Sequence, residues 1–562
     1  MMRRLLIGNT VLLLCVSLSG RTGLYAQGIV SSKHNMSVSG PGPVKATVEQ
    51  PVCAFCHIPH REGQVQPLWQ ASRRVTYTTY DSSTIKAKIG QPTGVSRLCL
   101  ACHDGTIAPG MLQGKSRALY LSGGMLTMPA GRTNLGVDLS DDHPISFVYD
   151  NALAARNGQL SYPASLLASP VKLDQSGQLQ CTSCHDSHDD RYGKFLVMDN
   201  RYSALCTTCH QIDYWSLTSH RSANATWNQM SPDPWPATPY NTVAENGCEN
   251  CHRPHSAGGR ERLMHFDAEE DNCFACHSGH VAERNIEKDF NKPSRHPVEK
   301  SRGIHDPDED PLWSARHVEC ADCHNPHACN ASPAKAPLAS GMLAQVAGVS
   351  SSGTPVKPIN FEYELCYRCH ADNPGSEPPV VTRYIFEKNL RLKFSSSNAS
   401  YHPVEAVGKN RDVPSLIIPY SPSSRISCTD CHASDSGSRT DDFNGPHGSM
   451  WEPILERQLM TSDFTAESAR AYALCYKCHN RSSILSDNSF SVHKKLVVEE
   501  RAPCTSCHDS HGVEQNTHLI NFDKTIVFPN DRGELRYQDL GRFRGACYLK
   551  CHSVNHDPKA YP

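Results

Sequence analysis

Residues 181–210 read CTSCHDSHDDRYGKFLVMDNRYSALCTTCH, and the pattern in this stretch organises the rest of the chain. It contains two Cys-x-x-Cys-His motifs, which end at His185 and His210, and a further histidine, His188, shortly after the first motif. The same arrangement returns before and after this stretch. A pattern that recurs along a chain indicates an internal repeat, and each copy supplies the same chemistry.

The cysteines of the chain belong almost entirely to this motif. Chance alone predicts only about 0.06 Cys-x-x-Cys-His motifs in a chain of this composition. Eleven occur, at Cys53/Cys56/His57, Cys99/Cys102/His103, Cys181/Cys184/His185, Cys206/Cys209/His210, Cys248/Cys251/His252, Cys273/Cys276/His277, Cys320/Cys323/His324, Cys366/Cys369/His370, Cys428/Cys431/His432, Cys475/Cys478/His479 and Cys504/Cys507/His508. A twelfth, Cys547/Cys551/His552, has one extra residue between its cysteines.

Three chemistries use paired cysteines: a disulfide, a zinc site and covalent haem attachment. Neither a disulfide nor a zinc site needs a histidine after every second cysteine. Haem c does, because two thioethers fix the edge of the porphyrin while the adjacent imidazole binds the iron. The sequence therefore predicts twelve covalently attached haem c groups, with a disulfide or an unattached pair as the alternative for the twelfth motif.

The remaining histidines supply a second ligand for each iron. A close histidine follows the first motif of most units, and another histidine precedes it, often before a proline. At Cys428 the close histidine is replaced by the one in Gly445-Pro446-His447. The predicted second ligands are His34, His60, His143, His188, His220, His255, His296, His327, His402, His447, His493 and His511.

The two rings of a Cys-His-x-x-His segment lie about one helical turn apart, so they cannot bind opposite faces of one haem. We expect the second ring to serve the other haem of the same unit, so that His188 would serve the haem of His210. His305 and His317 compete with His296 as a ligand. The remaining mature thiol, Cys329, is interpreted as inert. The histidines outside the repeat are interpreted as surface side chains; they are His265, His280, His305, His317, His518 and His556.

The 562-residue chain is poor in residues that build large apolar cores. Hydrophobic residues make up 38% and aromatic residues 7%, and there are 36 Gly and 38 Pro. We predict a mostly irregular fold with short α-helices and little β-sheet, an extended chain of six two-haem repeats with the haems as its core. A formal net charge of −2 without basic runs excludes nucleic acid as a partner.

Predicted boundaries follow the repeat. The signal peptide spans residues 1–26, because a basic start precedes a short apolar stretch and a small residue, Ala26. The haem units span residues 27–135, 136–215, 216–290, 291–395, 396–485 and 486–562, with an insertion at residues 331–358. Helices are expected at residues 203–210 and 466–479, and a hairpin at residues 522–537.

The repeated unit, Cys-x-x-Cys-His with a close His and then a second Cys-x-x-Cys-His, resembles the doubled-CXXCH multihaem cytochrome c family. This family includes periplasmic and outer-surface electron-transfer proteins. The resemblance implies electron relay through low-potential haems with two histidine ligands, in respiratory or extracellular electron transfer. The chain departs from it at the Cys547 motif, at the missing close histidine after His432 and in its insertions.

The expected protein is therefore an exported electron carrier and not an enzyme, located in the periplasm or at the cell surface. No stretch after residue 26 has the ~20 apolar residues of a membrane span. Its partners would be redox proteins or extracellular electron acceptors, within an outer-membrane complex or a homo-oligomeric filament. The alternatives are a multihaem reductase of nitrogen or sulfur oxyanions, which requires an open iron site, and a structural filament subunit.

Overall fold

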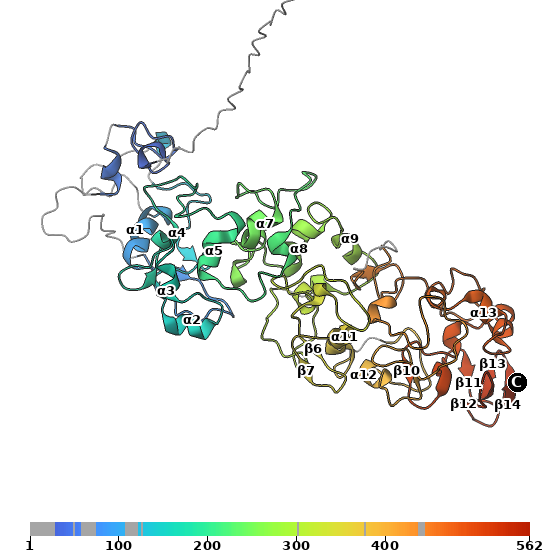
Figure 1. Ribbon diagram of the computed structural model, residues 1–562. Coiled ribbons are helices and arrows are strands. Elements are labelled where there is room, and N and C mark those ends of the chain that lie inside the picture. The colour runs from blue at the N-terminus through green and yellow to red at the C-terminus, as the bar shows by residue number, and fades with distance from the viewer. Residues whose placement is uncertain are drawn as a thin grey trace, which may run out of the picture. The chain divides into compact units, whose positions relative to one another are not determined.

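The computed structural model describes residues 28–48, 51–57, 75–106, 122–124, 127–300, 303–375, 378–436 and 444–561. Short helices and small sheets are joined by irregular chain (Figure 1). The predicted class, mostly irregular with short helices and little sheet, is confirmed. Among the described residues no helix is long and apolar enough to span a membrane. The predicted signal peptide and His60 lie outside the described residues.

The chain divides into two compact parts. The first contains the described residues of Met1–Arg74, Pro92–Gly136 and Pro170–Asp199, and the second contains those of Val75–Gln91, Val137–Ser169 and Asn200–Pro562. In the first part the helices are α1 (Gly94–His103) and α4 (Cys181–Cys184). In the second they are α2 (Asn151–Asn157), α3 (Pro163–Leu166), α5 (Ala204–Cys209), α6 (Ser219–Ser222), α7 (Val243–Asn246), α8 (Glu269–His277), α9 (Glu287–Phe290), α10 (Cys320–Cys323), α11 (Glu362–His370), α12 (Leu390–Lys393) and α13 (Arg481–Leu485).

Most motifs form a single helical turn. In the motif at Cys181 the amide of His185 donates to the carbonyl of Cys181 at 3.0 Å, which is the i to i−4 bond of an α-helix. The motifs at Cys53, Cys206, Cys248, Cys320, Cys428, Cys475 and Cys504 make the same bond at 2.9–3.0 Å. This turn places both cysteines on one face, with the histidine directly after them.

The second of the two residues between the cysteines often caps the start of this turn. The amide of Glu319 donates to Asp322 Oδ2 at 2.7 Å, and the amide of Ser427 donates to Asp430 Oδ2 at 2.8 Å. In the motif at Cys181, Ser183 Oγ accepts from the amide of Gln180 at 3.0 Å. A short polar side chain at this position therefore satisfies a backbone donor that the turn leaves unpaired.

The strands are short, apart from those of the C-terminal sheet. They are β1 (Thr78–Thr79), β2 (Asp138–Leu139), β3 (Phe147–Val148), β4 (Gln178–Leu179), β5 (Ser294–Arg295), β6 (Gly348–Val349), β7 (Pro355–Val356), β8 (Ser400–Tyr401), β9 (Gly448–Ser449), β10 (Gly512–Val513), β11 (Val527–Phe528), β12 (Arg536–Asp539), β13 (Gly545–Cys551) and β14 (Val554–Tyr561). Two antiparallel ladders, β5 with β9 and β8 with β10, lie directly beside predicted ligands. The first brings the chain next to His296 against the chain next to His447, and the second does the same for His402 and His511.

Close packing at the second ladder requires a glycine. A Cβ atom on Gly512 would lie 2.0 Å from the carbonyl oxygen of Lys393. Because that atom belongs to the backbone, it cannot give way as a flexible side chain could. The glycine directly after His511 therefore allows the loop that carries this histidine to approach α12.

The hairpin predicted at residues 522–537 does not form. Strands β11 and β12 both pair with β13, and β14 pairs with β13 as well, in a four-stranded sheet. The apolar residues of the segment pack together instead, in a cluster that includes Phe522, Ile526, Val527 and Leu535. Strands β11 and β12 pair with β13 instead of with each other, because β13 is longer than either of them.

The segment predicted to be an insertion, residues 331–358, contains β6 and β7, and its Val349 is fully buried beside Tyr367 and Phe394. The helix predicted at residues 466–479 is largely absent, because Met460 donates its amide to the carbonyl of Ala471 and Leu474 donates to Gln458. By contrast, the helix predicted at residues 203–210 is confirmed as α5.

Candidate haem-binding sites

Nine pairs of histidine rings face each other with ring centres 6.1–6.4 Å apart. Every pair joins one histidine of a Cys-x-x-Cys-His motif to one predicted second ligand. The pairs, motif histidine first, are His57–His188, His103–His34, His210–His143, His252–His327, His277–His220, His324–His447, His370–His296, His432–His511 and His508–His493.

The spacing of the rings suits a metal ion between them. Two imidazoles that bind one ion at about 2 Å from opposite sides have ring centres roughly 6 Å apart. The interplanar angles range from 6° for His432–His511 to 90° for His220–His277. A separation that stays constant while the angle varies fits rings held at one distance from a shared point. The donor set and its geometry therefore fit haem iron.

The motif histidines present the nitrogen that a metal needs. His252 donates its Nδ1–H to the carbonyl of Arg262 at 2.8 Å, and His103 donates to Thr133 at 2.7 Å. The same bond is made by His185 to Lys194, His324 to Met342, His432 to Pro453 and His508 to His518. A proton fixed on Nδ1 leaves the Nε2 lone pair free for a metal.

The histidines upstream of the motifs dock on the loop that carries a close histidine. His220 donates Nδ1–H to the carbonyl of Pro326, which precedes His327, at 3.0 Å. His34 contacts Ser187, His296 contacts Pro446 and His402 contacts Ser510 in the same way. The amide of His143 donates to Pro254, which precedes His255, at 2.8 Å. One contact thus orients two predicted ligands at once.

Burial favours the neutral form of two of these imidazoles, His210 and His447. The pKa of His210 is lowered to about 4 by burial and by its neighbours His143 and His252. Burial and the nearby His324 and Arg284 lower the pKa of His447 to about 3. Since only the neutral ring offers a lone pair, the environment favours the form that binds iron.

The pairing differs from the expectation within a unit. His188 faces His57, not His210, and His327 and His511 face motif histidines of the preceding unit. The reason is the docking contact: because Ser187 accepts from His34, the loop of His188 lies against the unit before it. Each of these three close histidines faces the histidine of the first motif in the preceding predicted unit.

The structure places other predicted ligands as follows. His296 faces His370, while His305 and His317 face carboxylates, so the geometry favours His296 among the three. His255 donates to Asp142 at 3.0 Å. Ser415 Oγ lies 2.9 Å from His479 Nδ1. Burial, together with the nearby His402, lowers the pKa of His479 to about 4.

The twelfth motif is built differently. Cys547 and Cys551 lie on strand β13, where the pairing register shifts between Cys547 and Leu549. His552 Nε2 lies 2.9 Å from Asp463 Oδ1, and Phe464 stacks on its ring. In the described part of the chain no histidine ring faces it.

The cysteines form no disulfide among the described residues. Instead, thiols of consecutive motifs contact each other: Cys99 hydrogen-bonds with Cys181, which together with burial raises the pKa of Cys99. The same contact joins Cys206 to Cys248, Cys273 to Cys320, Cys366 to Cys428 and Cys475 to Cys504. Each contact joins the second motif of one predicted unit to the first motif of the next.

Sequence reasoning missed residues that act through the ligands. The carbonyl acceptors of Nδ1 carry no sequence signal, because any residue offers a carbonyl. The interpretation of the six spare histidines as surface groups is wrong for His556, which is 7% exposed, and for His305, whose side chain is 12% exposed. His305 and His317, two histidines close in sequence that the repeat does not use, were the signal in the sequence for a second cluster of polar side chains.

Two family comparisons match parts of the chain. The doubled CXXCH motif matches residues 172–213 and 241–282, and the family of cytochrome c554 and c-prime matches residues 427–509. These matches support a multihaem c-type cytochrome. Its covalently bound haem serves electron transport. No curated protein matches the chain.

Proposed function

We propose that this cytochrome relays electrons along twelve low-potential haem c groups, each bound by two histidines, in respiratory or extracellular electron transfer. The cysteines of the twelve motifs would attach the haems, and the twelve motif histidines with the twelve second ligands predicted from the sequence would bind the irons. When bound, haem iron supplies one-electron transfer. The six two-haem units predicted from the sequence would order these groups along the chain.

The observation that carries the proposal is the alternation of two contacts. The ring pair His252–His327 lies beside the pair His277–His220, because His220 donates to the carbonyl before His327. A thiol contact then joins the Cys273 motif to the Cys320 motif. In the second part of the chain this alternation continues from the motif of Cys206 to that of Cys504. Such a series suits relay, because each centre has a neighbour on both sides.

The residues of the chain set the properties of this series. Backbone carbonyls hold the proton of each Nδ1, which fixes ring orientation and raises ligand basicity. Where the ring pairs are buried, as at His210 and His143, water is kept from the predicted iron. Two histidines on one iron leave no position for a substrate, so these sites favour electron transfer over catalysis.

A second candidate is a redox enzyme whose open site is the twelfth motif. The observation that favours it is the carboxylate of Asp463 beside His552, whereas nine other motif histidines have an imidazole opposite them. Such an iron could exchange its sixth ligand. Nitrogen or sulfur oxyanions are the substrates that this alternative would take.

The test of the proposal is the spectrum and intact mass of the purified, oxidised protein. We expect the mass of a chain cut near Gln27 with twelve haems, and a low-spin ferric spectrum. A high-spin signal of one iron per chain that shifts on adding nitrite or hydroxylamine would favour the enzyme instead. Eleven haems with free thiols at Cys547 and Cys551 would remove the twelfth site from the relay.

Replacing His188 with alanine is expected to convert one haem to the high-spin state. The affected haem should be that of Cys53 and Cys56, because His188 faces His57. Adding Cys53→Ser and Cys56→Ser should then abolish the new high-spin signal in electron paramagnetic resonance. Adding Cys206→Ser and Cys209→Ser instead should leave it in place.

His280→Ala is the matched control, because this histidine lies outside the ring pairs and its Nδ1 makes no hydrogen bond. It should change no haem. If the high-spin signal of His188→Ala disappeared with the haem of Cys206, each close histidine would serve its own unit, and the pairing described above would be incorrect.

Export places the relay outside the cytoplasm. We propose that residues 1–26 direct secretion and that the mature protein acts in the periplasm or at the cell surface, with redox proteins or extracellular acceptors as partners. An outer-membrane complex and a filament of identical subunits are the two assemblies that suit such a relay. Cell fractionation with haem staining distinguishes a periplasmic from a surface location.

A further inference from the structure

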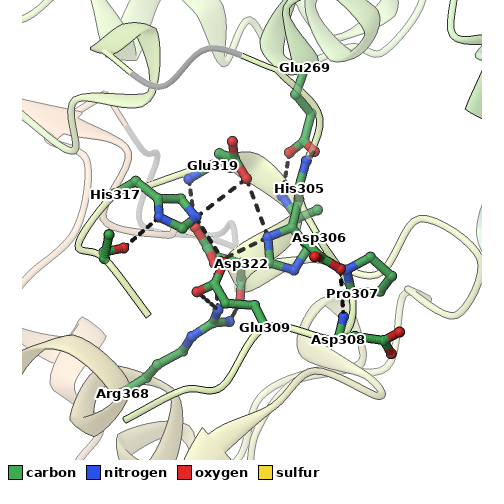
Figure 2. A network of polar contacts seen from close by, with 12 residues as sticks. Glu269, His305, Asp306, Pro307, Asp308, Glu309, His317, Glu319, Asp322 and Arg368 are labelled. Atoms are coloured by element: carbon green, nitrogen blue, oxygen red, sulfur yellow. Dashed lines mark hydrogen bonds and ion pairs between the residues drawn. The ribbon is translucent and has the colours of Figure 1, made fainter. Parts of the chain in front are cut away.

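His305 and His317, which belong to none of the nine ring pairs, lie in a compact group with carboxylates (Figure 2). His305, Glu309, His317 and Asp322 each place one ligand atom within 4.8 Å of all the others. The segment around residues 303–319 carries the first three, and α10 carries Asp322 and the flanking Glu319. Glu269 at the start of α8 and Arg368 on α11 enclose the group.

The charges of this cluster do not balance. Glu309, Glu319 and Asp322 are nearly buried, with side chains 13%, 9% and 9% exposed. Arg368 is the cation among them, 2.8 Å from both Glu309 Oε1 and Asp322 Oδ1. Three carboxylates against one guanidinium leave two negative charges. Buried charge without compensation is costly, so the site requires further positive charge.

His317 points a lone pair at these carboxylates. Its Nδ1–H donates to the carbonyl of Ala315 at 2.7 Å, which leaves Nε2 without a proton in the neutral ring. Nε2 lies 3.0 Å from Glu309 Oε2 and 3.6 Å from Glu319 Oε2. A lone pair facing two carboxylate oxygens is repulsive, so this nitrogen either takes up a proton or shares a bound cation with the carboxylates.

A second pair of atoms shows which cation fits. His305 Nδ1 and Glu319 Oε2 lie 3.3 Å apart, yet both are buried without a hydrogen bond. His305 Nδ1 is also 3.4 Å from Asp322 Oδ1. A proton on His305 would satisfy these atoms only through a directed hydrogen bond, whose geometry is absent. A metal ion accepts lone pairs from several directions and needs no such bond.

We propose that His305, Glu309, His317 and Asp322, with Glu319 beside them, bind one divalent transition-metal ion of the Zn²⁺ class. Two imidazoles with carboxylate oxygens are a donor set that Zn²⁺ accepts at about 2.0–2.2 Å in a tetrahedral site, whereas Ca²⁺ and Mg²⁺ prefer oxygen ligands alone. The charge of the ion equals the uncompensated charge of the cluster.

The position of the site gives it a structural role. Helices α8, α10 and α11, which enclose the cluster, all carry haem motifs, and they end at or next to His277, His324 and His370. The segment at residues 303–319 has no regular secondary structure. An ion held by this segment and by α10 would fix the loop against consecutive haem sites, as structural metals do in chains with small cores.

The test measures Zn²⁺ binding to the haem-loaded protein after treatment with a chelator. Equilibrium dialysis against Zn²⁺, followed by elemental analysis, should give one Zn²⁺ per chain, with affinity unaffected by excess Ca²⁺. His305→Ala with His317→Ala should weaken binding by about 100-fold or more. His280→Ala, which removes a histidine outside the cluster, should bind as the unmodified protein does.

Equal Zn²⁺ binding by the double variant and the unmodified protein would overturn the proposal, as would the absence of a tight Zn²⁺ site in the unmodified protein. The haem spectrum reports whether the double variant folds. If it does not, zinc-edge X-ray absorption on the unmodified protein decides, since two imidazoles with carboxylate oxygens are expected. A first shell with one imidazole or none would overturn the site.

Discussion

Produced without haem attachment, the chain is expected to remain unfolded. Two apolar clusters, the one with Val349, Tyr367 and Phe394 and the one with Phe522 and Leu535, have six buried members each. Loss of haem removes the groups that we propose to fill the interior, and native chains are stable by only about 5–15 kcal/mol. The deficit should exceed this margin. Circular dichroism and limited proteolysis of the apoprotein measure the outcome.

The control is the haem-loaded protein under the same conditions. It should resist protease and unfold cooperatively on heating, whereas the apoprotein should be digested throughout and show no transition. A cooperative transition in the apoprotein would mean that the small apolar clusters are enough to fold the chain. The haems would then bind to a fold that forms without them.

Local chemistry was predictable from the sequence. Cysteines three residues apart with an adjacent histidine fit one helical turn, and the amide of His185 makes the expected bond to Cys181. His447 also illustrates what sequence can reveal. Its spacing from the Cys428 motif departs from the repeat, yet Gly445-Pro446 marked it as the substitute, and it faces His324 at 6.1 Å.

The pairing of histidines that are far apart in the chain could not be predicted from the sequence. The contact of His34 with Ser187, which determines where His188 points, joins residues 153 positions apart. Nothing in the spacing within a unit shows that a loop docks on its predecessor. The cluster of His305 and His317 escaped for the same reason, since its ligands come together only when residues 303–319 pack against α10.

Removing one central haem is expected to interrupt electron flow through the second part of the chain. The variant Cys320→Ser with Cys323→Ser loses the haem between the ring pairs of His277 and His370, and the thiol contact with Cys273 disappears with it. In film voltammetry with the protein anchored at its N-terminus, haems beyond the gap should no longer be reduced at fast scan rates. The variant Cys547→Ser with Cys551→Ser is the control, because it removes a terminal motif and leaves the series intact.

At slow scan rates both variants should reduce their remaining haems completely, since solution mediators reach every centre given time. This dependence on scan rate distinguishes an interrupted series from a misfolded protein, whose spectrum would also lose its low-spin character. Unchanged fast reduction in the central variant would show that electrons reach the haems independently, and the alternation of ring pairs and thiol contacts would then serve folding instead of relay.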